Sequence, residues 1–325
     1  MELAVLITGG TGTLGKVVTK QLLRRGEVTK IVIFSRDEAA QVKMASEPEY
    51  RTNRVAYHIG DITDRDSLVR AIKTYRISHL IHTAALKHVP VCERQPSDCV
   101  QVNVVGSRNV LQVAAEFGVK RVVLVSTDKA AQPSNVYGLS KALMERLMHE
   151  YNGMGGMAVN TTRFGNLVGS RGSVLDLFLR QAKTEGRVTV TDPTMTRFFI
   201  RISQAADTVI YALSSQKSGL TFIPQMRSAR LEDFVKAVCE FAHVAPNIET
   251  IGPRPGEKQH ELVVGVDELP YTQRINDFDG VVLASKVAER ATLNAPISSE
   301  TAKRMDVDEL VGMIREVADR SKIEL

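Results

Sequence analysis

The sequence predicts an α/β fold in which a doubly wound parallel sheet is followed by a smaller C-terminal lobe. Two observations lead to this prediction. In the first half, short β-branched runs alternate with stretches of helical period, which is typical of a parallel sheet covered by helices on both faces. The first run also leads straight into a glycine-rich segment, Gly9 to Gly15. A strand, a glycine turn and a helix at the start of such a sheet indicate the Rossmann type.

The strands and helices of the first half can be read in order. The expected strands are nearly continuous in Val, Ile and Leu, as in strands buried on both faces; they are Leu3–Thr8, Lys30–Phe34, Val55–Ile59, Leu80–Thr83, Arg121–Ser126 and Val159–Arg163. The expected helices between them are Leu14–Arg25, Ser67–Arg76 and Ser97–Phe117. Gly26 and Gly118 follow two of these helices at the position where helices commonly end.

The alternation ends near residue 165. We therefore expect residues 1–165 to form a dinucleotide-binding domain, to which the chain returns near 203–225. Residues 166–202 and 226–325 should form the second, substrate-binding lobe. Its expected elements are the helices Ser203–Leu213, Ser228–Ala242 and Asp306–Ser321, the strand Gly219–Ile223 and the loop Ile251–Gly256.

Composition excludes several classes of protein. The net charge is +5 (42 basic and 37 acidic residues), scattered along a chain of 325 residues, with no Trp and 5% aromatics, so we expect no nucleic-acid partner. No stretch is apolar enough for a signal peptide or a membrane span. The three cysteines (Cys92, Cys99 and Cys239) and the seven histidines lack metal-ligand spacing. These features predict a soluble, cytoplasmic protein without a metal.

The glycine-rich segment is the candidate site for a cofactor pyrophosphate. Its glycines permit a tight turn, close approach of phosphates and close helix packing, and the helix that follows presents free amides. The candidate contacts are Thr8, Gly9, Gly12, Thr13, Leu14 and Gly15. The alternative is a purely structural turn. The spacing of the glycines resembles the extended branch of the short-chain dehydrogenase/reductase superfamily.

The residues after the second strand bear on the choice of cofactor. Ser35 and Arg36 come first, and a guanidinium there suits the 2′-phosphate of NADP. Asp37 follows and keeps NAD possible, and a solvated turn is the remaining alternative. Asp61, beside Ile62 after the third strand, lies where this superfamily contacts adenine, although it could equally cap the following turn.

Tyr137 and Lys141 lie four residues apart on an expected helix and so share one face. A neighbouring ammonium favours the phenolate, which would let Tyr137 act as a base. The fifth strand ends upstream in Ser126-Thr127-Asp128-Lys129. A carboxyl and an amine here supply a second acid–base pair, which suits elimination of water; a surface ion pair is the alternative.

Several segments, in order, resemble the soluble UDP-N-acetylglucosamine 4,6-dehydratases, and most closely the inverting enzymes that begin pseudaminic acid synthesis. The segments are 84–90 (AALKHVP), 126–130 (STDKA), 163–166 (RFGN), 169–173 (GSRGS), 191–193 (TDP), 195–198 (MTRF) and 254–258 (RPGEK). The resemblance covers about residues 4 to 264. Gln132 stands where the family pattern has Asn, and the tail beyond about 265 shows no match.

The resemblance implies catalytic roles. Thr127 would bond the sugar near its 4-hydroxyl, while Tyr137 removes that proton as hydride passes to NADP. Lys141 would lower the Tyr137 pKa and hold the nicotinamide ribose. Lys129 would take the carbon-5 proton, and Asp128 would protonate the departing 6-hydroxyl. Hydride then returns to carbon 6, so that tightly bound NADP is regenerated in each turnover.

The resemblance also implies binding residues. Ala84, Ala85 and Lys87 would lie along the cofactor. In the second lobe, expected to bind the nucleotide sugar, the implied contacts are Asn166 and Arg197 on the diphosphate, Thr191 at the uridine, and Lys87, Arg254 and Glu257. The substrate would be UDP-N-acetylglucosamine or a close UDP-sugar. We expect a homo-oligomer, with residues 97–117 as a candidate dimer face.

Three alternatives remain at this stage. A retaining 4,6-dehydratase or a 4-epimerase of a UDP-N-acetylhexosamine would use the same scaffold. Asp128 and Lys129 argue against the simple epimerase, which needs no second acid–base pair. The third alternative is a regulator that senses NADP without chemistry, and the intact Tyr137 and Lys141 pair argues against it.

Overall fold

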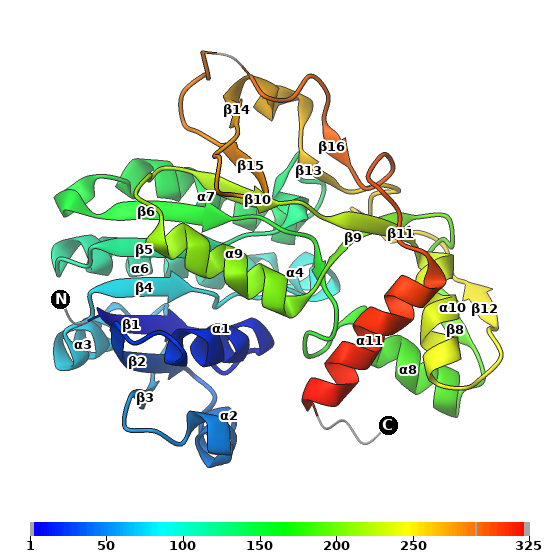
Figure 1. The fold of residues 1–325 in the computed structure, drawn as a ribbon, viewed down its shortest axis with the longest axis horizontal. Coiled ribbons are helices and arrows are strands. Elements are labelled where there is room, and N and C mark those ends of the chain that lie inside the picture. The colour runs from blue at the N-terminus through cyan, green and yellow to red at the C-terminus, as the bar shows by residue number, and fades with distance from the viewer. Residues whose placement is uncertain (1–2, 290, 322–325) are drawn as a thin grey trace.

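The computed structural model describes residues 3–289 and 291–321 and shows a large sheet at its centre (Figure 1). Within these residues the strand order is β14-β15-β10-β6-β5-β4-β1-β2-β3. The strands are β1 (Leu3–Thr8), β2 (Val28–Ser35), β3 (Val55–Ile59), β4 (His79–His82), β5 (Arg121–Val125), β6 (Ala158–Thr162), β10 (Thr221–Pro224), β14 (Thr272–Gln273) and β15 (Gly280–Leu283). All neighbours from β10 to β3 pair in parallel. The order 3-2-1-4-5-6 confirms the Rossmann type.

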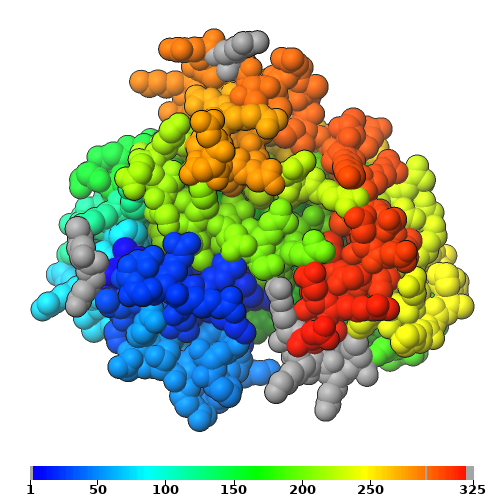
Figure 2. All heavy atoms as spheres, in the orientation of Figure 1, coloured from blue at the N-terminus to red at the C-terminus, as the bar shows by residue number. Residues whose placement is uncertain are grey.

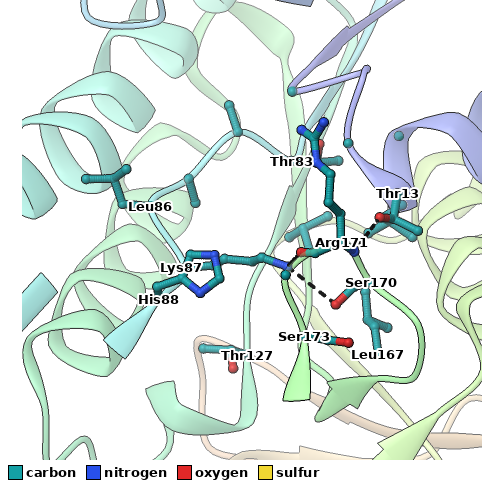
Figure 3. A pocket seen from close by; sticks show the side chains of 18 of the residues that line it. Thr13, Thr83, Leu86, Lys87, His88, Thr127, Leu167, Ser170, Arg171 and Ser173 are labelled. Atoms are coloured by element: carbon teal, nitrogen blue, oxygen red, sulfur yellow. Dashed lines mark hydrogen bonds between the residues drawn. The ribbon is translucent and has the colours of Figure 1, made fainter. Parts of the chain in front are cut away.

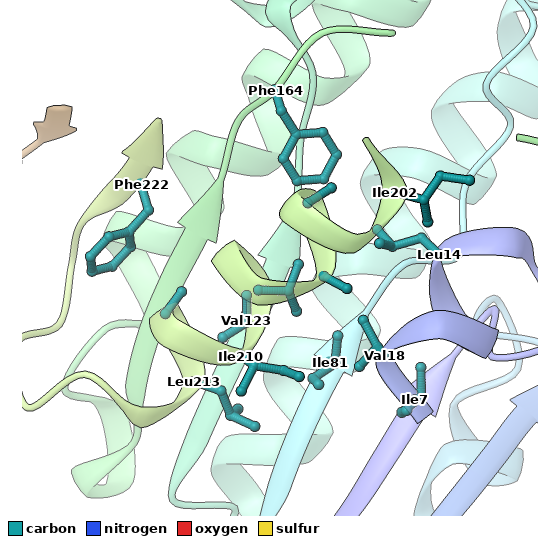
Figure 4. Close-up of a cluster of buried hydrophobic side chains, with 14 of the residues drawn as sticks. Ile7, Leu14, Val18, Ile81, Val123, Phe164, Ile202, Ile210, Leu213 and Phe222 are labelled. Atoms are coloured by element: carbon teal, nitrogen blue, oxygen red, sulfur yellow. The ribbon is translucent and has the colours of Figure 1, made fainter. Parts of the chain in front are cut away.

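Helices cover both faces of this sheet. One face carries α1 (Thr13–Leu23) and α9 (Ile202–Ser214), and the other carries α3 (Arg65–Tyr75), α6 (Gly106–Glu116) and α7 (Val136–Tyr151). Figure 4 shows the first layer, where Ile210 of α9 and Val18 of α1 lie against Ile81 and Val123 of the strands. Each such fully buried side chain stabilises the fold by about 1.5–3 kcal/mol.

The second lobe has its own apolar core, and its elements lie at the side of the large sheet (Figure 1). Phe199 and Phe234 stack in it with ring centroids 4.7 Å apart. The C-terminal helix α11 (Val307–Ser321) packs against α10 (Leu231–Phe241) in this lobe. Figure 2 shows the two segments side by side at the surface, in red and yellow. The elements are β7 (Asn166–Leu167), α8 (Val174–Thr184), β8 (Val188–Val190), β9 (Thr196–Ile200), β11 (Arg227–Arg230), α10 (Leu231–Phe241), β12 (Ile248–Thr250) and α11 (Val307–Ser321).

Three differences from the expected elements have local causes. The helix expected from Ser228 begins at Leu231, because residues 227–230 pair with β9 as strand β11. The helix expected over 97–117 is divided into α5 (Pro96–Val100), a wider π-type turn and α6. Two further short helices, α2 (Glu38–Ser46) and α4 (Val89–Arg94), precede them.

The chain returns to the large sheet more than once. Helix α9 begins one residue before the stretch 203–225, and strand β10 lies inside it. Strands β14 and β15 also join the sheet, so residues 272–283 extend it, although we had grouped them with the second lobe. Strand β15 runs antiparallel to β10. Strands β13 (Leu262–Val264) and β16 (Ile297–Ser298) pair in a separate two-stranded sheet. This pair links the segment before β14 to the segment after β15.

Two further features follow from the described coordinates. In the part of the chain that they cover, no helix combines the length and the apolar character needed to cross a bilayer. Cys92, Cys99 and Cys239 are buried free thiols.

Candidate active site

A cavity of about 740 Å³ opens at the carboxyl ends of the parallel strands, where ligands bind to sheets of this kind. Its walls come from both parts of the molecule. The large sheet contributes the glycine loop and the ends of β2, β4 and β5, and the second lobe contributes residues 164–175. A cavity of this size lies in the range of small-molecule and cofactor sites.

The glycine loop leaves room for a ligand because its own backbone is tightly packed. A Cβ on Gly9 would lie 2.8 Å from the Ala84 nitrogen, and one on Gly15 would lie 2.7 Å from the Gly10 Cα. Gly9 also has a positive φ of 67°. Helix α1 begins at Thr13 without a side-chain cap, so its first amides stay available to an anion. This cradle fits a dinucleotide pyrophosphate.

Most predicted cofactor residues line this cavity, but Thr8 does not. The residues that line it are Gly9, Gly12, Thr13, Leu14, Gly15, Ser35, Arg36, Asp61, Ile62, Ala84, Ala85, Lys87, Tyr137 and Lys141. Thr8 is fully buried, and its hydroxyl is 2.7 Å from His82 Nδ1. Its side chain therefore supports the end of β1 instead of facing the cavity.

The end of β2 presents Arg36 to the cavity beside Asp61, at 3.3 Å between Nη1 and Oδ2. Burial disfavours the charged Asp61, but hydrogen bonds from Thr63 and the Arg36 guanidinium outweigh it and lower the pKa of the carboxyl. Asp37 accepts from the Ala40 amide at 2.9 Å and caps α2. Asp37 also lines the cavity, so one carboxylate oxygen caps the helix while the side chain stays at the edge of the cofactor site.

A loop of the second lobe crosses the cofactor cradle. The Arg171 amide donates to the Thr13 hydroxyl at 2.9 Å, and Lys87 Nζ donates to the Arg171 carbonyl at 2.8 Å. Figure 3 shows the Arg171 side chain reaching toward Thr83. We had quoted this loop as a motif without giving Arg171 a role, since nothing in its local pattern shows that it folds back over the glycines.

Two caps bring the predicted catalytic residues together. Asn135 accepts from the Gly138 amide at 2.8 Å and starts α7, which places Tyr137 in the first turn. Thr127 caps the short 3-10 turn Asp128–Ala130. A Cβ on Gly138 would lie only 2.3 Å from the Lys129 carbonyl oxygen, so the turn and the helix are in direct contact.

Asp128 and Lys129 form a buried cluster with a third residue, Glu261. Lys129 Nζ lies 3.1 Å from Asp128 Oδ1 and 3.3 Å from Glu261 Oε1, and the Thr127 hydroxyl donates to Asp128 at 2.9 Å. Asp128 is fully buried, so the surface ion pair considered from the sequence does not occur. Glu261 was not predicted to belong to the site. The one sequence feature that could have indicated it is a carboxylate directly before the apolar run Leu262–Val264.

Burial dominates the pKa shifts of Tyr137 and Lys141. Burial raises the pKa of Tyr137 to about 12, although the Lys129 charge and the Thr127 hydrogen bond oppose this. Burial lowers the pKa of Lys141 to about 8, although the Glu145 carboxylate opposes it. Lys141 Nζ contacts Met144 Sδ at 2.9 Å. In this structure the charge that opposes the raised pKa of Tyr137 is that of Lys129, and the expected effect of Lys141 on Tyr137 stays a prediction.

The predicted substrate residues fall into two groups. Lys87, Thr127 and Asn166 line the cavity. The others meet around Glu257, whose Oε1 lies 3.1 Å from both Arg197 Nη2 and Thr191 Oγ1. The Arg254 amide donates to Glu257 Oε2 at 3.2 Å. This second group lies outside the cavity lining and forms a separate polar cluster.

Gln132 gives the departure from the family pattern a structural meaning. Its φ is +43°, in the left-handed region that Asn adopts more readily than Gln. The Asn expected at this position thus suits the local backbone. Among the described residues, no group of His, Cys, Asp and Glu could hold a metal ion.

Comparison with known proteins places these features in context. Residues 5–281 match the family model described as "Polysaccharide biosynthesis protein". The UDP-N-acetylglucosamine 4,6-dehydratase (inverting) of Campylobacter jejuni serotype O:23/36 is 36% identical over 88% of this chain and 84% of its own. The UDP-glucose 4-epimerase of Rickettsia rickettsii is 35% identical over 86% and 82%. The X-ray structure of Pen from Bacillus thuringiensis covers 97% of this chain and 98% of its own, with a TM-score of 0.89 and 35% identity.

Proposed function

Because this chain belongs to the polysaccharide biosynthesis protein family, we propose that it is a hydro-lyase acting on UDP-N-acetylglucosamine. The proposed reaction removes water across carbons 5 and 6 with inversion at carbon 5, and gives a UDP-4-keto-6-deoxy sugar. The observation that carries this proposal is the buried Asp128–Lys129 pair, 3.1 Å apart, whose turn contacts the first turn of the helix that bears Tyr137. An epimerase that only moves a hydride and one proton has no use for this second acid–base pair.

The proposed cofactor is NADP, which when bound would accept a hydride from carbon 4 and return it to carbon 6. The glycine loop and the first turn of α1 would hold its pyrophosphate. Arg36 would bind the 2′-phosphate, because it directly follows β2 and its side chain is accessible from the cavity. Asp37 lines the same cavity with one oxygen bound to the Ala40 amide, so the preference for NADP rests on Arg36.

The proton steps follow from the hydrogen bonds of the site. Tyr137 would take the proton of the 4-hydroxyl, with Thr127 bonded to the same part of the sugar and Lys141 at the nicotinamide ribose. In the resting charge state Lys129 is an ammonium, since Asp128 and Glu261 together outweigh its burial and raise its pKa. It becomes a base by passing a proton to Asp128 across their hydrogen bond. Lys129 then removes the carbon-5 proton, Asp128 protonates the 6-hydroxyl, and water leaves.

The substrate diphosphate would bind at Asn166 and Arg197. Arg197 is buried and paired with Glu257, so we propose that it exchanges this partner for the diphosphate, which a guanidinium can hold with two hydrogen bonds. Thr191 would contact the uridine, while Lys87, Arg254 and Glu257 complete the contacts.

A second candidate activity is 4-epimerisation, because the Rickettsia rickettsii relative carries that name at 35% identity. A retaining dehydratase differs only in the face from which carbon 5 is reprotonated. A regulator that binds NADP without turnover is a third possibility. One experiment separates all of them.

The test incubates the purified protein with NADP and UDP-N-acetylglucosamine in heavy water and follows the sugar by NMR. We expect deuterium at carbon 5 with inverted configuration and loss of the 6-hydroxyl. Lys129→Ala or Asp128→Asn should slow water loss by about 10²–10⁴ while 4-oxidation persists, which leaves NADPH with a 4-keto sugar.

Each contrary result has a distinct meaning. Deuterium with the original configuration at carbon 5 would indicate a retaining enzyme, and a UDP-N-acetylgalactosamine product would indicate an epimerase. No change in the sugar would favour the regulator. Unimpaired water loss in both variants would remove Asp128 and Lys129 from the chemistry.

A further inference from the structure

Glu261 is a buried carboxylate that the second half of the chain delivers to the catalytic cluster. It stands directly before strand β13 and is 3% exposed. Its Oε1 lies 3.3 Å from Lys129 Nζ, whereas its Oε2 is buried without a hydrogen-bond partner. Asp128 Oδ2, in the same cluster, is also buried and unpartnered. Two carboxylates thus share one ammonium and keep spare acceptor capacity.

Such a carboxylate needs compensation, because burying an ion costs several kcal/mol unless it is paired. Four charged groups face Glu261 from the surrounding elements: Asp128 and Lys129 from the 3-10 turn, Arg197 from β9 and Lys258 from its own segment. Lys258 Nζ also donates to the Ala131 carbonyl at 2.9 Å. Tyr137 of α7 is the remaining titratable neighbour of Lys129. The cluster holds more charge than a structural ion pair requires.

The backbone of Glu261 is fixed by the tail that the family resemblance left unassigned. The Glu261 amide donates to Ser299 Oγ at 2.9 Å, and the Ser299 amide donates to the Glu261 carbonyl at 2.8 Å. The Ser299 hydroxyl lies 2.7 Å from that of Thr196, which ties the pair to β9. The carboxylate is therefore fixed from the backbone, and it reaches Lys129 from a different segment of the chain than Asp128 does.

From this geometry, and resting on the dehydration proposed above, we infer that Glu261 is a positioning residue for water elimination. It holds the flexible Lys129 side chain beside Asp128. It also supplies the counter-charge for the ammonium that forms when Lys129 takes the carbon-5 proton while Asp128 still carries its own. Without Glu261, that ammonium would form in a buried site with no carboxylate of the protein beside it until Asp128 released its proton, and the sugar enolate would be its sole counter-charge.

The inference predicts the direction of a pH shift. The Glu261 charge stabilises the Lys129 ammonium and disfavours the Asp128 carboxylate, so it raises the pKa of both groups. Replacing Glu261 by Gln removes that charge and should lower both pKa values. Both limbs of the pH profile of elimination should therefore move to lower pH. A variant that had only lost packing would lower the rate without moving the limbs.

The test compares wild type, Glu261→Gln and Glu261→Asp, with Glu300→Gln as the control. Glu300 lies in the same tail, with a 59% exposed side chain 3.7 Å from His260. Single-turnover NADPH absorbance would report 4-oxidation, and deuterium entry at carbon 5 with loss of the 6-hydroxyl would report elimination. We expect Glu261→Gln to lose elimination about 10²-fold, at the lower end of the effect of a positioned acid or base, and to keep 4-oxidation within about threefold. Glu261→Asp keeps the charge and should restore the wild-type pH limbs.

The outcomes distinguish this inference from the function on which it rests. If wild type leaves the sugar unchanged, the proposed dehydration fails. If wild type eliminates water and Glu261→Gln does so at the same rate and pH, the inference about Glu261 is wrong. An equal loss of 4-oxidation and elimination, with unmoved pH limbs, would also overturn it and leave Glu261 a structural residue.

Discussion

The cofactor-binding half and the second lobe present their functional groups in different ways. In the first half, the site consists of backbone and of side chains at strand ends: the glycine loop, Arg36 after β2 and Thr127 after β5. In the second lobe, charged side chains are paired with one another, as Arg197 is with Glu257. A parallel sheet gathers its strand ends at one edge, so sequence order suffices to predict a site there. The lobe has no such rule, and its site depends on contacts between distant segments.

A buried ion cluster ties the end of β6 and helix α7 to the tail that extends the large sheet. Arg163 follows β6 and is 2% exposed. Its guanidinium pairs with Glu145 of α7 and with Glu268, 2.7 Å away in the tail, and it donates to the Val263 carbonyl at 2.9 Å. Glu145 is also the carboxylate that opposes the lowered pKa of Lys141. The cluster thus reaches from the tail to α7, one turn beyond Lys141.

The largest expected effect is on 4-oxidation, and it tests whether the catalytic base of the cofactor-binding half can be predicted from the sequence alone. Tyr137→Phe should lower 4-oxidation by about 10²–10⁴, because no group remains to take the 4-hydroxyl proton. NADPH absorbance and product should vanish together. Tyr151→Phe, at the other end of α7, is the matched control and should stay near wild type. Near-normal reduction of bound NADP by Tyr137→Phe would show that another group is the base.

The contrast explains how much could be predicted. Local patterns predicted the doubly wound parallel sheet, the glycine turn, and Asp128, Lys129 and Tyr137 as one site, because each depends on a single βα unit or on neighbouring strands. They did not give Glu261, which reaches Lys129 across 132 positions of sequence. Nor did they give the capping role of Asp37, since a carboxylate after a strand can face either a ribose or the next helix.

The next largest effect is on stability, and it tests the buried ion cluster around Arg163. Arg163→Met should lower the free energy of unfolding by about 3–5 kcal/mol, because Glu145 and Glu268 would be left without their cation in a buried place. Urea unfolding measures the change. Arg187→Met is the control: its pair with Glu249 is 55% and 45% exposed, so the change should stay within about 1 kcal/mol. Equal, small changes in the free energy of unfolding of both variants would mean that apolar packing alone holds the tail against β6 and α7.

The smallest expected effect is on cofactor affinity, and it tests whether Arg36 distinguishes NADP from NAD. Arg36→Ala should weaken NADP binding by about 1–3 kcal/mol, the range for a hydrogen bond to a charged group, and leave NAD binding almost unchanged. The reason is local: the Arg36 guanidinium is 59% exposed and pairs with Asp61, so its removal disturbs little packing. Titration of each cofactor into the purified protein, followed by calorimetry, gives both affinities, with NAD as the internal control. If both affinities fall equally, Arg36 acts on a part that the two cofactors share, and the end of β2 does not distinguish them.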